Sequence, residues 1–176
     1  MKFKKFSLFI LVLLVMLMPV SAFDWDTHEY VAEKTCEEFN CHYSELVRSC
    51  SVLPDKMKEV YGSEESDKHF CFSFYCPAKR ATKVWLEKAK FENDEMKKWC
   101  YIGIASHYFA DSRAPTHQSV FRVKVKCHGE SETLVGEFVK NSTQSWNANM
   151  CGINFSDVDL HELIFDYKII VKETVF

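Results

Sequence analysis

The chain has 176 residues, a formal net charge of −3 and 47% hydrophobic residues. This length is enough for one domain with a single core. The acidic balance does not suggest a general nucleic-acid-binding protein, although a nuclease stays open because bound metal ions change the local charge.

The first 22 residues have the features of a secretory signal peptide. Three lysines precede an almost wholly apolar run over 6–20, and small residues follow at 20–22. Because the apolar run is short for a membrane span, we expect cleavage and secretion, with an uncleaved membrane anchor as the alternative. Cleavage would leave one domain over 23–176, in which 19 basic residues face 25 acidic ones.

All eight cysteines lie beyond the predicted signal peptide. An even number of cysteines in an exported chain indicates disulfide bonds, and the sequence does not show how they pair. Thiolate ligands for zinc are the alternative, but no Cys-x2-Cys pair occurs. We expect four disulfides.

Apolar periodicity and capping residues predict an all-α domain. The predicted helices, in chain order, cover 23–40, 43–50, 55–61, 78–91, 94–112, 130–146 and 157–175. Residues 121–126 alternate apolar and basic side chains, which is a strand-like pattern. The four prolines and five glycines are few, as is typical of a compact helical protein.

The predicted helix over 94–112 carries the strongest candidate for a metal site. His107 and Asp111 are four residues apart, so they share one face of this amphipathic helix. Pro115 ends the helix and places His117 on the following turn. Burying a carboxylate in an apolar helix face is costly unless it is paired or bound to a metal. Imidazole and carboxylate are ligands that zinc takes in proteins.

Other histidines and acids extend this pattern. His28 follows a tryptophan near the start of the first helix, Asp55 precedes His69 across a polar loop, and His128 is four residues before Glu132. Each has a simpler explanation, as a core histidine, a helix cap or a solvated surface pair. Together in one small domain they favour a site for several metal ions.

These residues resemble the zinc-dependent phospholipase C family, whose superfamily includes the zinc-dependent single-strand nucleases. The most specific match is His-Tyr-Phe-Ala-Asp at 107–111, followed by Ala-Pro-Thr-His at 114–117. The pair His128 and Glu132 and the pair Asp55 and His69 also match the family pattern. The resemblance covers roughly 25–138 and implies an all-α domain that holds three zinc ions in a cleft.

The resemblance also implies how the ligands are shared. The implied first zinc has the ligands Asp55, His69, His107 and Asp111. The implied second zinc has Asp111 as a bridging ligand, together with His28 and the backbone amino and carbonyl groups of Trp25. The implied third zinc has the ligands His117, His128 and Glu132.

The start of the domain departs from the family pattern. In the family the tryptophan is the mature N-terminus, whereas cleavage after residue 22 would leave Phe23 and Asp24 ahead of Trp25. Either the cut falls after Asp24, or further trimming occurs, or the second zinc is bound differently. The spacing from Trp25 to His28 is also shorter than in the family.

Bound zinc lowers the pKa of water toward neutrality and neutralises charge on a phosphodiester, and the resemblance implies Asp55 as an orienting base. We therefore expect a secreted, monomeric phospholipase C that contacts the membrane surface transiently and releases a diacylglycerol-type lipid and a phosphorylated headgroup. Glu132 favours this function over a single-strand nuclease, which usually has aspartate at that position. A non-catalytic, disulfide-rich helical binding module is the third interpretation, because the chain is short for either enzyme.

Overall fold

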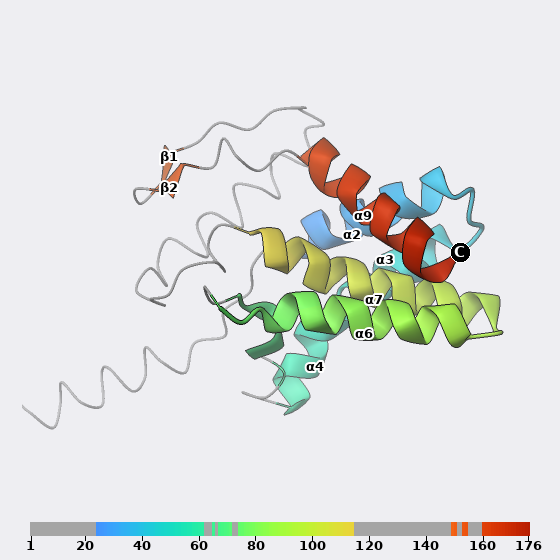
Figure 1. Cartoon of the computed structure of the whole chain (residues 1–176), viewed down its shortest axis with the longest axis horizontal. Coiled ribbons are helices and arrows are strands. Elements are labelled where there is room, and N and C mark those ends of the chain that lie inside the picture. The colour runs from blue at the N-terminus through green and yellow to red at the C-terminus, as the bar shows by residue number, and fades with distance from the viewer. Residues whose placement is uncertain are drawn as a thin grey trace, which may run out of the picture.

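The structure is a computed structural model in which helices dominate. It describes residues 24–61, 65, 67–71, 74–114, 149–150, 153–154 and 160–176. Its elements are α2 (Trp25–Glu38), α3 (Ser44–Ser51), α4 (Leu53–Tyr61), η1 (Asp67–His69), α6 (Pro77–Phe91), α7 (Glu95–Arg113), β1 (Asn149–Met150), β2 (Ile153–Asn154) and α9 (Leu160–Val175). The predicted helical architecture is confirmed for this part of the chain (Figure 1).

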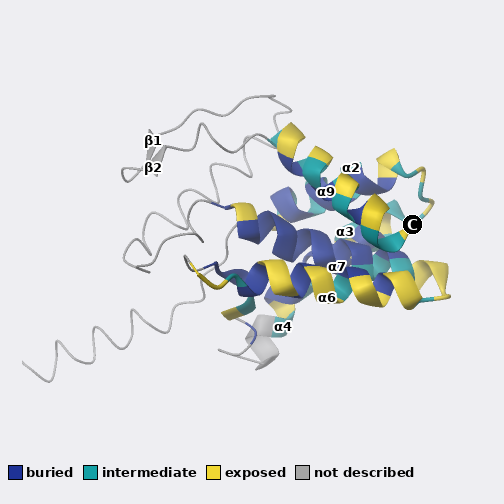
Figure 2. Cartoon of the chain, in the orientation of Figure 1, coloured by how far each residue is buried: buried dark blue, intermediate teal, exposed yellow. Residues whose placement is uncertain are grey.

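Helix α7 is the centre of the packing, because α2, α3, α6 and α9 all contact it. Every side chain from Ile102 to Ser112 is buried (Figure 2). The amphipathic pattern predicted for this helix is therefore wrong over these residues. A helix that is covered on all sides places its polar residues in the protein interior as well.

Helices α6 and α7 lie side by side and are joined by a short connection (Figure 1). Asp94 caps α7, since its carboxylate accepts a hydrogen bond from the Lys97 amide at 3.0 Å. The buried residues of α6 include Ala78, Ala81 and Ala89. Small side chains on this face let the two helices approach closely along their length.

Helix α3 also packs closely against α7. A Cβ atom added to Gly103 would lie 2.5 Å from the carbonyl oxygen of Val47, so a larger residue does not fit between the two backbones. The disulfide Cys50–Cys100 joins the same two helices. Helix α9 contacts α7 through Tyr167, whose hydroxyl donates a hydrogen bond to the Ile102 carbonyl at 2.6 Å.

Three disulfides are formed within the described residues: Cys36–Cys41, Cys50–Cys100 and Cys71–Cys76. The disulfide expectation is thus confirmed for six of the eight cysteines. Several parts of the prediction lie outside the described residues. They are Cys127, Cys151, the strand-like segment 121–126, the helix 130–146 and the signal peptide 1–22. The short antiparallel pairing of β1 with β2 was not predicted. None of the described helices is long and apolar enough to cross a membrane.

Candidate metal centre

Five of the predicted ligands converge in the interior, although they come from four separate elements. Helix α2 supplies His28, α4 supplies Asp55, η1 supplies His69, and α7 supplies His107 and Asp111. The three histidines and Asp111 are fully buried, and Asp55 keeps 8% of its surface exposed. The fold therefore brings together residues that are up to 83 positions apart in the sequence.

Three of these side chains form a tight triangle. The distances are 2.6 Å from His69 Nδ1 to Asp111 Oδ2, 3.3 Å from His107 Nε2 to the same oxygen, and 3.1 Å between the two imidazole nitrogens. Ligand atoms about 2 Å from a tetrahedral zinc ion are about 3.3 Å apart. Two of the three distances are close to that value, and the shortest is a hydrogen bond. This triangle could hold a metal ion.

A second group adjoins the triangle. His28 Nε2 lies 3.5 Å from Asp111 Oδ1, and the His28 ring stacks on His107 with 3.7 Å between the ring centroids. Asp55 Oδ1 lies 3.9 Å from His107 Nε2 and 4.0 Å from His69 Nδ1. The ligand atoms of His28, Asp55 and His107 lie within 4.8 Å of one another and could also hold a metal ion.

The position of His107 is set by helix geometry and by a contact with α3. One helical turn separates it from Asp111, as the sequence spacing requires. His107 Nδ1 lies 2.7 Å from the carbonyl oxygen of Ser51, the last residue of α3. That carbonyl is an acceptor, so Nδ1 carries the proton and Nε2 faces the other ligands. A second nitrogen fixed in this way is typical of histidines that bind metals.

Burial and mutual attraction shift the pKa values of this cluster. Burial, with a smaller contribution from His107, lowers the pKa of His28 to about 3, so His28 is neutral at pH 7. Burial alone would lower the pKa of His107, but the nearby Asp111 carboxylate raises it. Burial would raise the pKa of Asp111, yet His107 and His69 hold it well below its usual value. The carboxylate therefore stays ionised in the protein interior.

A polar pair that the sequence pattern did not predict, Tyr108 and Glu65, adjoins the cluster at His69. The Tyr108 hydroxyl donates a hydrogen bond to the Glu65 carboxylate, which also lies 2.6 Å from Lys68 Nζ. The Tyr108 ring packs against His69 with 5.3 Å between centroids. Burial and then the hydrogen bond to Glu65 raise the pKa of Tyr108. The signal in the sequence was weak, since Glu65 lies in a polar stretch without apolar periodicity.

The remaining predicted ligands are the backbone groups of Trp25 and three side chains farther along the chain. Trp25 begins α2, one turn before His28, and its side chain is 49% exposed. Lys56 Nζ lies over its indole ring, 5.4 Å from the centroid. His117, His128 and Glu132 lie outside the described residues.

A surface groove between α2 and α9 is distinct from the histidine cluster. It is lined by Tyr30, Lys34, Glu37, Glu38, His161, Glu162, Ile164, Phe165 and Lys168. None of the five clustered side chains contributes to it.

Comparison of the chain with protein-family models, with curated proteins and with solved structures finds no match in any of the three.

Proposed function

We propose that this chain is a secreted zinc-dependent phosphodiesterase of the phospholipase C type, which releases a diacylglycerol-type lipid and a phosphorylated headgroup. The proposal depends on one observation, the buried cluster of three histidines and two aspartates. These five residues are the ones that the resemblance to the zinc-dependent phospholipase C family implies for the first zinc and for part of the second. The helical architecture and the disulfides are compatible with that family and with secretion.

The orientation of Asp111 supports a site with two metal ions. Its Oδ2 faces His69 and His107, whereas its Oδ1 is nearest to His28. A carboxylate that bridges two ions has to direct one oxygen toward each. Within the described part of the chain, the basic groups placed within 4.0 Å of Asp111 are these three imidazoles. The donor set fits zinc, which takes nitrogen and oxygen ligands together.

The protonation of the cluster also fits a metal site. Asp111 attracts a proton to His107 in the metal-free protein, and a cation bound at the same place would replace that proton. His28 is already neutral and needs no deprotonation to act as a ligand.

When bound, zinc would supply a Lewis acid for the phosphate oxygens and lower the pKa of water toward neutrality. In this proposal Asp55 orients the attacking water and accepts its proton. Its exposure supports that role, because Asp55 is the one member of the five that keeps solvent contact. Trp25 would complete the second zinc site, and His117, His128 and Glu132 would form the third.

Metal analysis and two parallel assays test the proposal. The purified mature protein is expected to contain close to three zinc ions per chain and to hydrolyse a phosphocholine ester but not single-stranded DNA. Cleavage of DNA alone would replace the phospholipase by the nuclease interpretation. Protein without zinc would contradict both enzymes and favour the binding module. N-terminal sequencing that starts at Trp25 would support its amino group as a ligand.

A further inference from the structure

An exposed aromatic pair lies in a loop close to the metal centre. Phe74 is fully exposed and Tyr75 is 57% exposed, within the loop that the disulfide Cys71–Cys76 closes. A phenylalanine in a loop gains nothing from contact with water, whereas burial of its side chain in an apolar environment is favourable. A loop held by a disulfide also keeps its side chains projecting without further loss of entropy on binding.

Helix α6, which follows this loop directly in the chain, carries a row of cations on its exposed face. Its exposed positions carry five basic residues and one acidic residue, namely Lys79, Arg80, Lys83, Lys88, Lys90 and Glu87. Apolar side chains lie among them, since Val84 is 42% exposed and Phe91 is 77% exposed. The opposite face of α6 packs against α7 (Figure 2). A concentration of positive charge in a chain of net charge −3 favours binding to an anionic surface.

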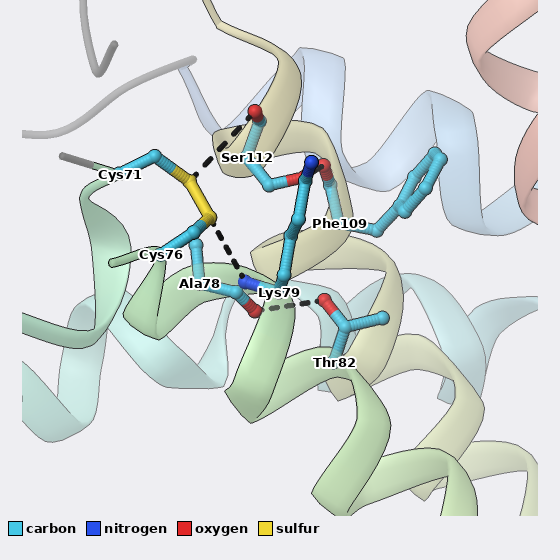
Figure 3. The surroundings of a disulfide bond; sticks show 7 residues. All are labelled: Cys71, Cys76, Ala78, Lys79, Thr82, Phe109 and Ser112. Atoms are coloured by element: carbon cyan, nitrogen blue, oxygen red, sulfur yellow. Dashed lines mark hydrogen bonds between the residues drawn. A yellow bond between two sulfur atoms is a disulfide. The ribbon is translucent and has the colours of Figure 1, made fainter. Parts of the chain in front are cut away.

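This aromatic–basic surface, which comprises the Phe74–Tyr75 loop and the exposed face of α6, is attached directly to the candidate metal centre. Cys71 Sγ lies 3.9 Å from the carbonyl oxygen of Ser112, and Ser112 follows the predicted ligand Asp111 (Figure 3). Cys71 itself is two residues after His69. On the other side of the disulfide, Cys76 caps α6 by accepting from the Lys79 amide (Figure 3).

We propose that the aromatic–basic surface binds anionic phospholipid bilayers. Phe74 and Tyr75 enter the boundary between headgroups and acyl chains, and the α6 cations lie at the level of the lipid phosphates. The combination of Phe74, Val84 and Phe91 with lysines favours a lipid surface over a nucleic acid, because an aliphatic side chain such as valine offers no stacking face. This inference rests on the proposed function, because it names the surface by which the proposed phospholipase contacts its membrane, but vesicle binding itself requires neither the metal nor catalysis.

Co-sedimentation with lipid vesicles tests the inference. The mature protein is expected to bind vesicles of phosphatidylcholine with phosphatidylglycerol more tightly than vesicles of phosphatidylcholine alone, and to bind less tightly as salt increases. Phe74→Ser combined with Tyr75→Ser should weaken binding at least about tenfold. Lys79→Gln combined with Arg80→Gln should weaken binding to the anionic vesicles roughly 25-fold, about fivefold for each cation.

Matched controls lie on α9, where Phe165 and Lys172 are also exposed. Phe165→Ser and Lys172→Gln should leave vesicle binding unchanged, and all variants should keep the unfolding temperature of the parent. Equal weakening by the controls, equal affinity for both kinds of vesicle, or binding to single-stranded DNA but not to vesicles would overturn the inference. Protein treated with a chelator should bind vesicles as before. Vesicle binding therefore tests the membrane inference even if the protein proves to hold no metal.

Discussion

His69 Nδ1 lies 2.6 Å from Asp111 Oδ2, although 42 residues separate them in the sequence. Both side chains are fully buried, and His107 lies within 3.3 Å of each. A buried ionised carboxylate at the meeting point of three imidazoles is the feature on which the candidate metal centre depends.

Asp111→Asn is expected to remove zinc and activity together. The substitution keeps the size of the side chain but removes the charge that would attract a cation. Loss of a supporting residue around a metal typically costs 10- to 100-fold, so loss of this ligand should reduce activity by at least about 100-fold. Elemental analysis of dialysed protein measures the zinc content. His161→Ala, at an exposed position on α9, is the control and should retain both zinc and activity. Unchanged zinc in the Asp111 variant would contradict the assignment.

Tyr108→Phe is expected to destabilise the protein by about 1.5–3 kcal/mol. The substitution leaves the buried Glu65 carboxylate without the hydroxyl that donates to it, and hydrogen bonds to charged groups have this magnitude. Urea unfolding measures the change. Tyr75→Phe removes an exposed hydroxyl and should have almost no effect. Equal stability of the two variants would mean that the Glu65 contact contributes nothing.

Gly103→Ala is expected to lower stability by about 1–3 kcal/mol, because a Cβ atom would lie 2.5 Å from the Val47 carbonyl oxygen. Helix propensity alone predicts that the same substitution raises stability, since alanine is favoured over glycine by about 1 kcal/mol in a helix interior. Chemical denaturation decides between these two effects. Lys97→Ala, on the exposed surface of the same helix, should change stability little. A more stable Gly103 variant would show that α3 and α7 can move apart.

Loss of Cys50–Cys100 is expected to cost more than loss of Cys36–Cys41. The first bridge closes a loop of 50 residues and the second a loop of 5. The loop-entropy relation gives about 4 and about 2 kcal/mol for these lengths. Replacing both cysteines of each pair by serine and measuring urea unfolding compares them.

The Cys50–Cys100 bridge should also affect the metal. It holds α3 against α7, where the Ser51 carbonyl accepts from His107 Nδ1. Zinc affinity should therefore fall in the Cys50–Cys100 variant and stay unchanged in the Cys36–Cys41 variant. Equal affinity in both would show that the Ser51 contact does not depend on the bridge.

Stability of the metal-free protein is expected to fall as the pH decreases from about 6.5 to about 3. His28 has a pKa of about 3 in the folded protein and 6.5 in the unfolded chain, so unfolding takes up a proton over this range. Asp111 acts in the same direction at lower pH, because its folded pKa lies below the unfolded value of 3.8. His107 acts in the opposite direction. Its pKa is raised in the folded protein, so its protonation stabilises the fold at low pH, and this stabilisation is lost as the pH rises through that pKa.

Urea unfolding with a chelator at pH 4, 5, 6 and 7 measures this dependence. His28→Gln should reduce the slope of stability against pH, whatever its effect on absolute stability. His42→Gln, at an exposed position, should leave the slope unchanged. An unaltered slope in the His28 variant would mean that His28 takes up its proton without unfolding.

Much of the helical structure could be predicted because helices leave local signals. The predicted helix over 78–91 corresponds to α6, and the one over 94–112 corresponds to α7, each within one residue of the observed ends. The periodic apolar positions and the scarcity of glycine and proline were sufficient for this. The predicted helix over 157–175 corresponds to α9 (Leu160–Val175), and its first three predicted residues lie outside the described part of the chain.

The sequence by itself also determined that His107 and Asp111 share a helix face, because 3.6 residues per turn fixes that relation whatever the rest of the chain does. The tertiary structure alone decided that the same helix is covered on all sides, that His28, Asp55 and His69 converge on it, and that the Ser51 carbonyl sets the proton position on His107. It also decided the pairing of six cysteines and the contact between Glu65 and Tyr108. These relations join segments far apart in the chain, and the angles and distances at which helices pack are not encoded in the spacing of residues along any one of them.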